Sequence, residues 1–290
     1  KTGMTRDEKS NPAEIGTYLL EFGKLTQYTG DSIYYKTAKK AAFEVYKHRS
    51  RLDLVGTVID VNTGNWLNTE SQIGARIDSY YEYLFKCWLL FGDKDCKEAW
   101  EKHKVAIQKY LFRETSHGTY LTRVDMNTGQ ETRPYYGALD AFYAGMIALS
   151  GDPDNAEKIQ KANYSMWTRF GIEPEEFNFR EDTLVYPSYP LRPENLESCF
   201  YLFRITGQEE YLWEGKRMFG DILNNCKTDA GFASLKNVKT GEQDDEMESF
   251  FFAETLKYAY LLFAPENLVN LDQVVFTTEA HPLLIKRKLL

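Results

Sequence analysis

Four stretches of similar pattern decide the fold: LTQYTGDSIYYKTAKKA (25–41), WLLFGDKDCKEAWEKHK (88–104), IALSGDPDNAEKIQKAN (147–163) and FRITGQEEYLWEGKRMF (203–219). In each, an apolar helix ends at a glycine, an acidic or amide residue follows, and a new amphipathic helix begins. A glycine at such a place is typical of the left-handed residue after a helix, and the next Asp or Ser is typical of an N-cap. Each stretch therefore predicts a helical hairpin.

These hairpins recur at a regular spacing. The glycines Gly30, Gly92, Gly151 and Gly207 are 62, 59 and 56 residues apart, and a turn at Ala264-Pro265-Glu266 continues the series 57 residues later. Such a repeat predicts stacked hairpins, either an open solenoid or a closed (α/α) toroid. The apolar runs 84–91 and 250–263 favour the toroid, because the helices of an inner ring are covered on two sides. No linker of low complexity divides the chain, so we predict one all-α domain over residues 1–290.

A second motif follows the hairpins. A turn that ends in Asn-Thr-Gly or Lys-Thr-Gly follows a β-rich run three times, at 61–64, 126–129 and 238–241. Short strands before such turns predict small β-hairpins, which we expect at one end of the stack.

The composition excludes several classes of function. The 43 acidic residues outnumber the 35 basic ones, and the net charge of −8 argues against nucleic acid or an anionic membrane as partner. No apolar run approaches the roughly 18–20 residues of a membrane span. The four cysteines, Cys87, Cys96, Cys199 and Cys226, allow one or two disulfides and demand none. The four histidines form no metal-binding or triad pattern, and a glycosylation sequon, Asn163-Tyr164-Ser165, lies inside a predicted helix.

Carboxylates interrupt several apolar helix starts, in segments 11–17, 74–82, 189–198 and 245–254. Any one of them is explained as an acid facing the helix dipole or as part of a capping box. Glu194 and Glu197 share a helix face, however, and Glu254 follows apolar or small residues, which capping does not explain. Carboxylates that converge in a helical ring indicate acid–base chemistry on a neutral polar substrate, with sugars foremost. Holding a cation is the alternative use of the same acids.

Five stretches, four of which overlap these segments, carry a family resemblance: AEIGTYLLEFGKLTQYTGD (13–31), IGARIDSYYEYL (73–84), YPLRPENLESCFYLFRITG (189–207), DEMESFFFAETLKY (245–258) and VVFTTEAHPL (274–283). They resemble the class I α-1,2-mannosidases, glycoside hydrolase family 47, over nearly the whole chain. The resemblance implies an (α/α)7 toroid plugged by a β-hairpin. It also implies inverting hydrolysis of terminal α-1,2-linked mannose from high-mannose N-glycans, with one calcium ion.

The resemblance assigns roles to ten residues. Glu194 matches the general base that activates water, and Asp78 matches the second catalytic carboxylate, with an acid or relay role. Thr278 matches the residue that binds calcium through its hydroxyl and its carbonyl, with waters completing the shell. Arg76 matches a position that sets branch preference, and Phe250 matches a platform for the sugar ring. Positions that hold the sugar or the calcium waters are matched by Glu14, Arg192, Glu197, Phe250, Glu254 and Glu279.

Departures from the family pattern bear on the subfamily. Ala138 stands where the processing mannosidases have a histidine, and Ala141 and Asn163 stand where they have disulfide cysteines. These positions resemble the ER degradation-enhancing mannosidase-like branch, whereas Glu14 and Arg76 resemble the processing enzymes.

The chain also matches no counterpart of the first two family hairpins, roughly 120 residues by the repeat length, where the family carries a glutamate treated as proton donor. Either a companion polypeptide, such as a separate N-terminal fragment left by proteolytic nicking, completes the toroid, or the chain is a fragment of the family domain. The alternative is a module that binds glycans without cutting them. The resemblance implies the secretory pathway, with the ER lumen foremost, or an extracytoplasmic place in a bacterium.

Overall fold

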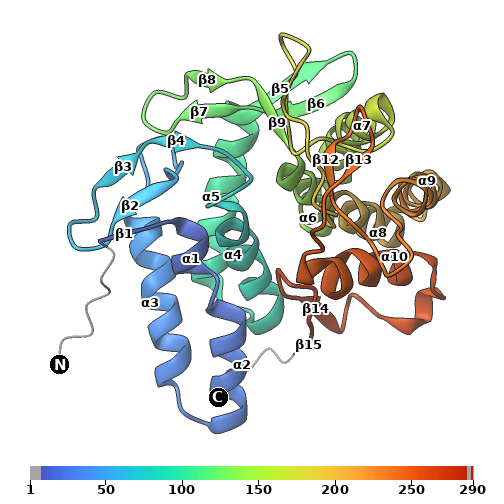
Figure 1. Ribbon diagram of the computed structural model, residues 1–290. Coiled ribbons are helices and arrows are strands. Elements are labelled where there is room, and N and C mark those ends of the chain that lie inside the picture. The colour runs from blue at the N-terminus through green and yellow to red at the C-terminus, as the bar shows by residue number, and fades with distance from the viewer. Residues whose placement is uncertain (1–7, 286–288, 290) are drawn as a thin grey trace. The chain divides into compact units, whose positions relative to one another are not determined.

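A computed structural model describes residues 8–285 and 289, which group into two compact units (Figure 1). The first unit draws on residues 1–111, 123–132 and 272–290, and the second on residues 112–122 and 133–271. Helices dominate both, and the strands form small antiparallel sheets of two or three. None of the described helices is long and apolar enough to cross a membrane.

The first unit holds two helical hairpins and most of the short strands. Its helices are α1 (Pro12–Gly16), α2 (Leu19–Thr29), α3 (Ile33–Lys47), α4 (Asp78–Phe91) and α5 (Lys94–Leu111). Its strands are β1 (Lys9–Ser10), β2 (Val58–Asp60), β3 (Trp66–Asn68), β4 (Glu70–Ser71), β7 (Arg123–Asp125), β14 (Val274–Phe276) and β15 (Pro282–Leu284), and β8 (Glu131–Arg133) reaches its edge. The sheets run β1-β2-β3, β4-β7-β8 and β14-β15.

The second unit holds two further hairpins and a shorter final helix. Its helices are α6 (Phe142–Leu149), α7 (Pro153–Phe170), α8 (Glu194–Thr206), α9 (Glu209–Asn225) and α10 (Leu256–Phe263), with a π-helical turn η2 (Phe251–Thr255) and 3-10 turns η1 (Ala138–Ala141) and η3 (Glu266–Leu268). Its strands are β5 (Phe112–Thr115), β6 (Gly118–Leu121), β9 (Tyr135–Gly137), β10 (Glu176–Asn178), β11 (Thr183–Tyr186), β12 (Leu235–Asn237) and β13 (Glu242–Gln243).

The predicted hairpin turns are confirmed. Gly30, Gly92 and Gly207 follow α2, α4 and α8 in the left-handed conformation, with φ of 75°, 72° and 69°. Gly151, with φ of 87°, lies between α6 and α7. The predicted series does not continue to a fifth helical hairpin within the described residues. The chain does turn after α10, as expected, but only the short η3 and then β14 follow.

The expected contrast between apolar and amphipathic helices is also present. Helix α6 is buried from Phe142 to Ala148, and most of α4 and α8 is buried too, whereas α5, α7 and α9 each expose one face. Helices α6 and α8 cross closely, because a Cβ on Gly145 would come within 3.0 Å of the Ser198 backbone. The Ser198 hydroxyl accepts from the Gly145 amide at 2.8 Å and donates to the Ala141 carbonyl at 2.5 Å.

The three predicted β-hairpins share one turn design. Asp60, Asp125 and Asn237 each accept a hydrogen bond from the backbone amide two residues further on, at 2.9–3.0 Å. Gly64, Gly129 and Gly241 then supply positive φ, as the Asn/Thr-Gly pattern requires. The strands joined are β2–β3, β7–β8 and β12–β13.

The cysteines divide into one disulfide and two thiols. Cys87 near the end of α4 is bonded to Cys96 in the first turn of α5, and Cys199 and Cys226 are free and buried. The sequon asparagine Asn163 is buried in α7, where its amide donates to the Ala141 carbonyl and to Gln160.

Candidate active site

Unusual backbone conformations mark the expected site segments. Among the described residues, five non-glycine residues have positive φ, and three of these border the predicted catalytic residues or calcium ligand. Arg76 (φ 77°) precedes Asp78 by two residues, Leu191 (φ 64°) precedes Glu194 by three, and Ala280 (φ 55°) follows Thr278 by two. Such residues persist only where the surrounding structure holds them, and they cluster at functional sites.

Within the first unit, Glu14, Arg76 and Asp78 come together where α1 meets the start of α4. The Ala13 amide donates to the Arg76 carbonyl at 2.9 Å, and the Thr17 and Ser79 hydroxyls lie 2.6 Å apart. Asp78 is the first residue of α4 and is half-buried. Glu14 and Arg76 are exposed. The segment thus offers one partly covered carboxylate beside two solvent-facing charges.

Glu14 is also explained by a purely local role as an acidic residue at the start of a helix. Asn11 caps α1 by accepting from the Glu14 amide at 3.0 Å, and the Ser10 hydroxyl donates to the Glu14 carboxylate at 2.8 Å. This arrangement is local and needs no ligand.

Thr278 and Glu279 lie in the loop of the β14–β15 hairpin, within the first unit. The Thr278 amide lies 3.4 Å from the Tyr83 hydroxyl of α4, and that hydroxyl donates to Glu21 of α2 at 2.6 Å. The Lys24 ammonium donates to the Leu284 carbonyl at 2.6 Å and so ties the hairpin to α2. Two helices therefore hold the hairpin that carries the predicted calcium ligand.

Oxygen-bearing side chains lie near Thr278: Glu279 follows it, and the Tyr83 hydroxyl near its amide also contacts Glu21. Burial raises the pKa of Glu21, and the negative charges of Glu82 and Glu279 raise it further, so three carboxylates act on one another here. Hard cations such as Ca²⁺ take six to eight oxygen ligands. Among the described residues, the only close group of three Cys, His, Asp or Glu side chains is Cys87, Asp93 and Cys96, elsewhere in the unit. The residues around Thr278 therefore fit a calcium ion whose remaining shell is water, and they do not fit a zinc site.

Glu82 has a partner that sequence reasoning overlooked. Its carboxylate forms an ion pair with Lys86 one turn along α4, and both side chains are almost fully buried. The i, i+4 spacing is usual for surface pairs, so only the apolar run around it, Tyr80–Leu84, signalled burial.

Within the second unit, Arg192 and Glu194 lie at the start of α8. The Arg192 guanidinium binds both Glu175 oxygens, at 3.0 and 2.5 Å, and the bidentate contact fixes its plane. Glu194 is the first residue of α8 and interacts electrostatically with Arg192. The helix start and the cation both attract negative charge there.

Phe250 lies against Arg192 in the same unit. The guanidinium carbon is 5.4 Å from the centre of its ring, a cation–π distance. Phe250 is half-buried, so part of the ring remains open to a ligand.

Glu197 and Glu254 complete this set. Glu197 is buried one turn into α8 and accepts from the Tyr258 hydroxyl at 3.0 Å. Glu254 lies within η2, the π-helical turn that precedes α10, and the Thr255 hydroxyl donates to the Leu191 carbonyl at 2.7 Å. π-Helical turns inside helices frequently mark functional sites. The structure thus gathers Arg192, Glu194, Glu197, Phe250 and Glu254 around the start of α8.

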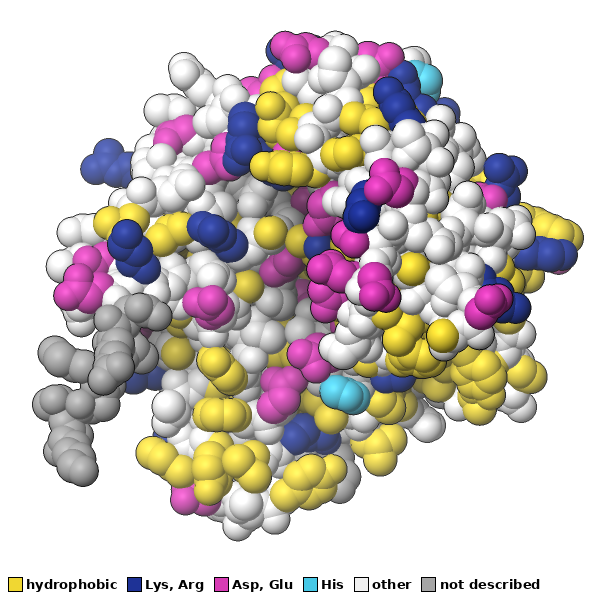
Figure 2. All heavy atoms as spheres, viewed as in Figure 1, with side chains coloured by type: hydrophobic (Ala, Val, Ile, Leu, Met, Phe, Trp, Pro, Cys, Tyr) yellow, Lys and Arg dark blue, Asp and Glu magenta, His cyan; other side chains and the backbone are white. Residues whose placement is uncertain are grey.

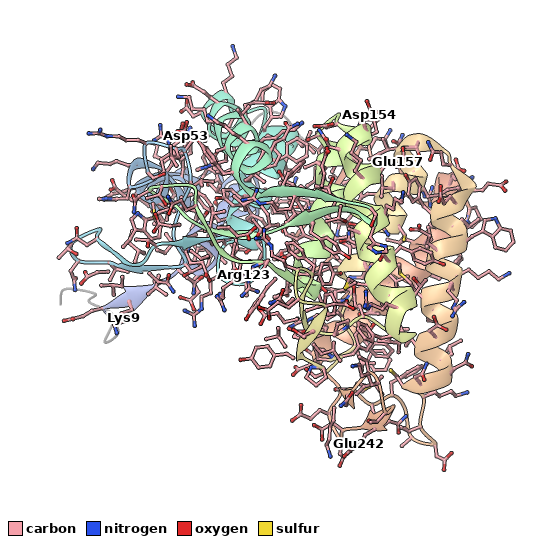
Figure 3. The ribbon with its side chains drawn as sticks, turned by 90° about the horizontal axis from the view of Figure 1, so that it is seen from above. Lys9, Asp53, Arg123, Asp154, Glu157 and Glu242 are labelled. Atoms are coloured by element: carbon pink, nitrogen blue, oxygen red, sulfur yellow. A yellow bond between two sulfur atoms is a disulfide. The ribbon has the colours of Figure 1, made fainter. Side chains whose placement is uncertain are left out.

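Glu173 is a further carboxylate that the sequence did not single out. It is fully buried between α7 and β10, and burial raises its pKa to about 8. Ordinary acids such as Asp154 and Glu157, by contrast, extend into solvent from the start of α7 (Figure 3). No local pattern predicted Glu173, because its hydrogen-bond partners Tyr136 and Asn195 are 37 and 22 residues away.

Comparisons with known proteins identify the family of the chain. The family model described as glycosyl hydrolase family 47 matches residues 1–285. Alpha-mannosidase I MNS5 of Arabidopsis thaliana is 37% identical over 98% of this chain and 50% of its own length. The ER degradation-enhancing alpha-mannosidase-like protein 2 of Mus musculus is 37% identical over 93% of this chain and 50% of its own length. The chain thus spans about half the length of these curated relatives.

Solved structures show the same fold. The α-1,2-mannosidase from Trichoderma reesei superposes with a TM-score of 0.87 and 28% identity, over 97% of this chain and 67% of the fungal one. A D-mannose isomerase, with a TM-score of 0.69, 15% identity and coverage of 90% of this chain and 73% of its own, shares the fold alone. The expected (α/α) fold class is therefore confirmed, and the chain belongs to glycosyl hydrolase family 47.

Proposed function

We propose that this chain is the catalytic part of a calcium-dependent enzyme that removes terminal α-1,2-linked mannose from high-mannose N-glycans with inversion. The observation that carries the proposal is the arrangement at the start of α8, where Glu194 lies beside the Arg192–Glu175 pair. The likeness to a fungal α-1,2-mannosidase supports the same substrate class.

In this proposal each residue has a stated role. Glu194 is the general base that takes a proton from the attacking water, and Asp78 is the second carboxylate, acting as acid or relay. Phe250 is the apolar face for the mannose ring, and Arg192 orients it through the contact between guanidinium and ring. The carboxylates Glu14, Glu197, Glu254 and Glu279 hold sugar hydroxyls or metal-bound waters, and Arg76 contacts the branch beyond the cleaved mannose.

Calcium is the proposed cofactor, held by the hydroxyl and carbonyl of Thr278. When bound, it offers a hard centre that grips two sugar hydroxyls. The hydroxyl and carbonyl of Thr278 on the β14–β15 hairpin, with the carboxylates of Glu21 and Glu279 nearby, support this assignment.

Replacing the base tests the enzymatic proposal directly. We expect Glu194→Gln to lower mannose release by about 10²–10⁴-fold, the usual contribution of a general base, with an unchanged thermal midpoint. Glu157→Gln, an exposed glutamate on α7, is the matched control and should keep full activity. Undiminished release by Glu194→Gln would sink the proposal. Saturable glycan binding without any release by the wild type would identify a glycan-binding module instead.

We also propose that helices of a companion segment cover part of the second unit. A groove of about 530 Å³ runs along α10 between Phe219, Tyr260, Phe263 and Pro265, and Tyr260 and Phe263 are 64% and 43% exposed. Figure 2 shows hydrophobic side chains gathered at the lower right of the view, over the end of α10 and the residues after it. Apolar faces of this kind on a helix are usually covered by a partner. Intact mass and sedimentation test this: a lone 33.7 kDa species that stays monomeric contradicts it.

The secretory pathway, with the ER lumen foremost, is the proposed location, with a role in degradation of misfolded glycoproteins, or an extracytoplasmic place in a bacterium. The Cys87–Cys96 disulfide supports it, because such bonds persist in oxidising compartments.

A further inference from the structure

Glu173 has an unusual set of contacts for a buried carboxyl group. Its Oε2 accepts from the Tyr136 hydroxyl of β9 at 2.7 Å and from the Asn195 amide of α8 at 2.9 Å. Its Oε1 is equally buried and has no hydrogen-bond partner among the described residues. An ionised carboxylate would leave a charged oxygen buried and unsatisfied, which is costly. The burial, with no partner at Oε1, therefore favours the neutral acid and outweighs the two donors to Oε2, which by themselves favour the carboxylate.

The charges around Glu173 point the same way. Glu194 and Glu175 both repel a negative charge at Glu173, and Arg192, a cation that interacts with Glu173, is already bound to Glu175 through both oxygens. Two neighbouring carboxyl groups in a buried place cannot both ionise cheaply. Among the described residues, the titratable and charged groups that act on Glu173 and its partner Tyr136 include Tyr120, Tyr136, Asp140, Glu175, Tyr189, Arg192, Glu194 and Cys199.

Asn195 links this acid to the start of α8. It follows Glu194 directly, and its side-chain amide also lies 3.4 Å from the Asn163 carbonyl of α7. Its side-chain oxygen accepts from Gln160 at 3.0 Å, and the same Gln160 nitrogen contacts Glu214 at 3.0 Å. A buried chain of hydrogen bonds thus fixes the residue next to Glu194 from both sides.

We propose that Glu173 is a positioning residue, held as a neutral acid against the first turn of α8, which fixes Asn195 and leaves the negative charge at this place to Glu194. Burial raises the pKa of Glu173 to about 8, so the acid loses its proton only in alkaline solution. The kinetic consequence rests on the proposed hydrolase function, and the neutrality of Glu173 does not.

Unfolding experiments on this chain test the neutrality alone. The folded-state pKa is raised above that of the unfolded chain, so the stabilising effect of the proton is full below about pH 4.5 and falls as the pH rises to about 8. Urea unfolding of the wild type and of Glu173→Gln at several pH values should therefore show the wild type losing stability steadily relative to Glu173→Gln over this range. Gln mimics the neutral acid, so its own curve lacks this contribution. Parallel curves would show that Glu173 is ionised in the folded protein and would overturn the proposal.

The pH dependence of mannose release tests the effect on Glu194. We expect the wild type to lose about tenfold in rate per pH unit above pH 8, because each unit changes the protonated fraction tenfold. Glu173→Gln should keep most of its rate at pH 6–7 and lose this alkaline decline. Tyr136→Phe removes a donor that stabilises the carboxylate, so the decline should move to higher pH. Glu157→Gln, the same change at an exposed glutamate of α7, should keep the wild-type decline.

A uniform loss of rate at every pH in Glu173→Gln, or an unchanged alkaline decline, would show a merely structural role and overturn the positioning role. If the wild type releases no mannose at any pH, the proposed hydrolysis fails by itself. The calorimetric affinity for a high-mannose glycan, measured over the same pH range with the same variants, then replaces the rate.

Discussion

A single side chain can decide whether a site binds a sugar ring, and Phe250 of the second unit is an example. Its ring is half-buried and carries the Arg192 guanidinium 5.4 Å from its centre. An aromatic face packs against the apolar face of a pyranose ring, whereas an aliphatic side chain offers no flat surface and no cation–π contact.

We therefore expect Phe250→Leu to raise the KM for a high-mannose substrate about tenfold, since the aromatic contacts are worth roughly 1 kcal/mol each. Phe252→Leu is the matched control, because Phe252 is 57% exposed two residues away on the same turn. Steady-state kinetics on both variants separate the predictions. Equal KM values for the two variants would remove Phe250 from the sugar site.

A buried histidine gives a second test at this scale. His103 of α5 accepts or donates through Nε2 to the Tyr80 hydroxyl at 3.2 Å, and its Nδ1 lies 2.6 Å from the Asp53 carbonyl. Burial lowers its pKa to about 4. The unfolded chain therefore binds this proton first as the solution is acidified, and stability that is present above pH 6.5 is lost as the pH falls towards 4.

The expected loss is about 3 kcal/mol between pH 6.5 and 4, from the difference between the two pKa values. Urea unfolding of the wild type should show it, and His103→Gln should not, even if that variant starts less stable. Comparing the two curves cancels the carboxylates that titrate in the same range. If the difference between them does not change with pH, the histidine is not the cause.

At the scale of elements, the turn of the α4–α5 hairpin is held by both a disulfide and polar contacts. The Cys87–Cys96 bond closes its turn, the Tyr35 hydroxyl donates to Asp93 at 2.7 Å, and Lys39 pairs with the same carboxylate at 2.7 Å. Both contacts come from α3, so a disulfide and an ion pair hold the same corner. A closed loop of this length should contribute about 2–3 kcal/mol to the free energy of unfolding.

Replacing both cysteines by serine should therefore lower the free energy of unfolding by about 2–3 kcal/mol. A reductant should lower the thermal midpoint of the wild type and leave that of the Cys87→Ser/Cys96→Ser protein unchanged. Thiol counting by mass spectrometry provides the control. Four free thiols in the unreduced wild type would contradict the bond.

The elements also show where sequence reasoning succeeds. The turns of the helical hairpins and of the three β-hairpins were predictable, because Gly30, Gly64 and their counterparts supply a positive φ that other residues adopt at a cost. The acids of α8 and η2 were found because they interrupt apolar helices. Glu173 and Tyr136 left no such trace, since their pairing depends on how α7, β9 and α8 pack. The fifth hairpin failed for a related reason: its turn was read correctly, but no amphipathic period follows Pro265.

At the scale of the whole molecule, the proposed calcium ion would couple the predicted site to folding. An ion that binds only the folded protein stabilises it by about 2.7 kcal/mol at a hundred times its dissociation constant. Since Thr278 lies on the β14–β15 hairpin that α2 and α4 hold, we expect Ca²⁺ to raise the thermal midpoint and a chelator to lower it.

Thr278→Val, which keeps the shape and removes the hydroxyl, should abolish this calcium-dependent shift. Mg²⁺ should not replace Ca²⁺, because it demands a rigid octahedral shell. Differential scanning fluorimetry with each ion gives the measurement. If a chelator changes neither the thermal midpoint nor the mannose release of the wild type, the calcium proposal is wrong.

The buried sequon on α7 has a consequence for biogenesis. Asn163 is 2% exposed, and its amide nitrogen, the atom that would carry a glycan, is engaged with Ala141 and Gln160. A sugar attached there could not be accommodated once α7 has packed, so an oligosaccharide transferred during translocation would trap the chain unfolded. Folded molecules should therefore carry no glycan at Asn163. Any molecules that are glycosylated at Asn163 should be found among those that failed to fold and await degradation. Site occupancy, measured by peptide mass spectrometry, thus records the competition between folding and glycan transfer.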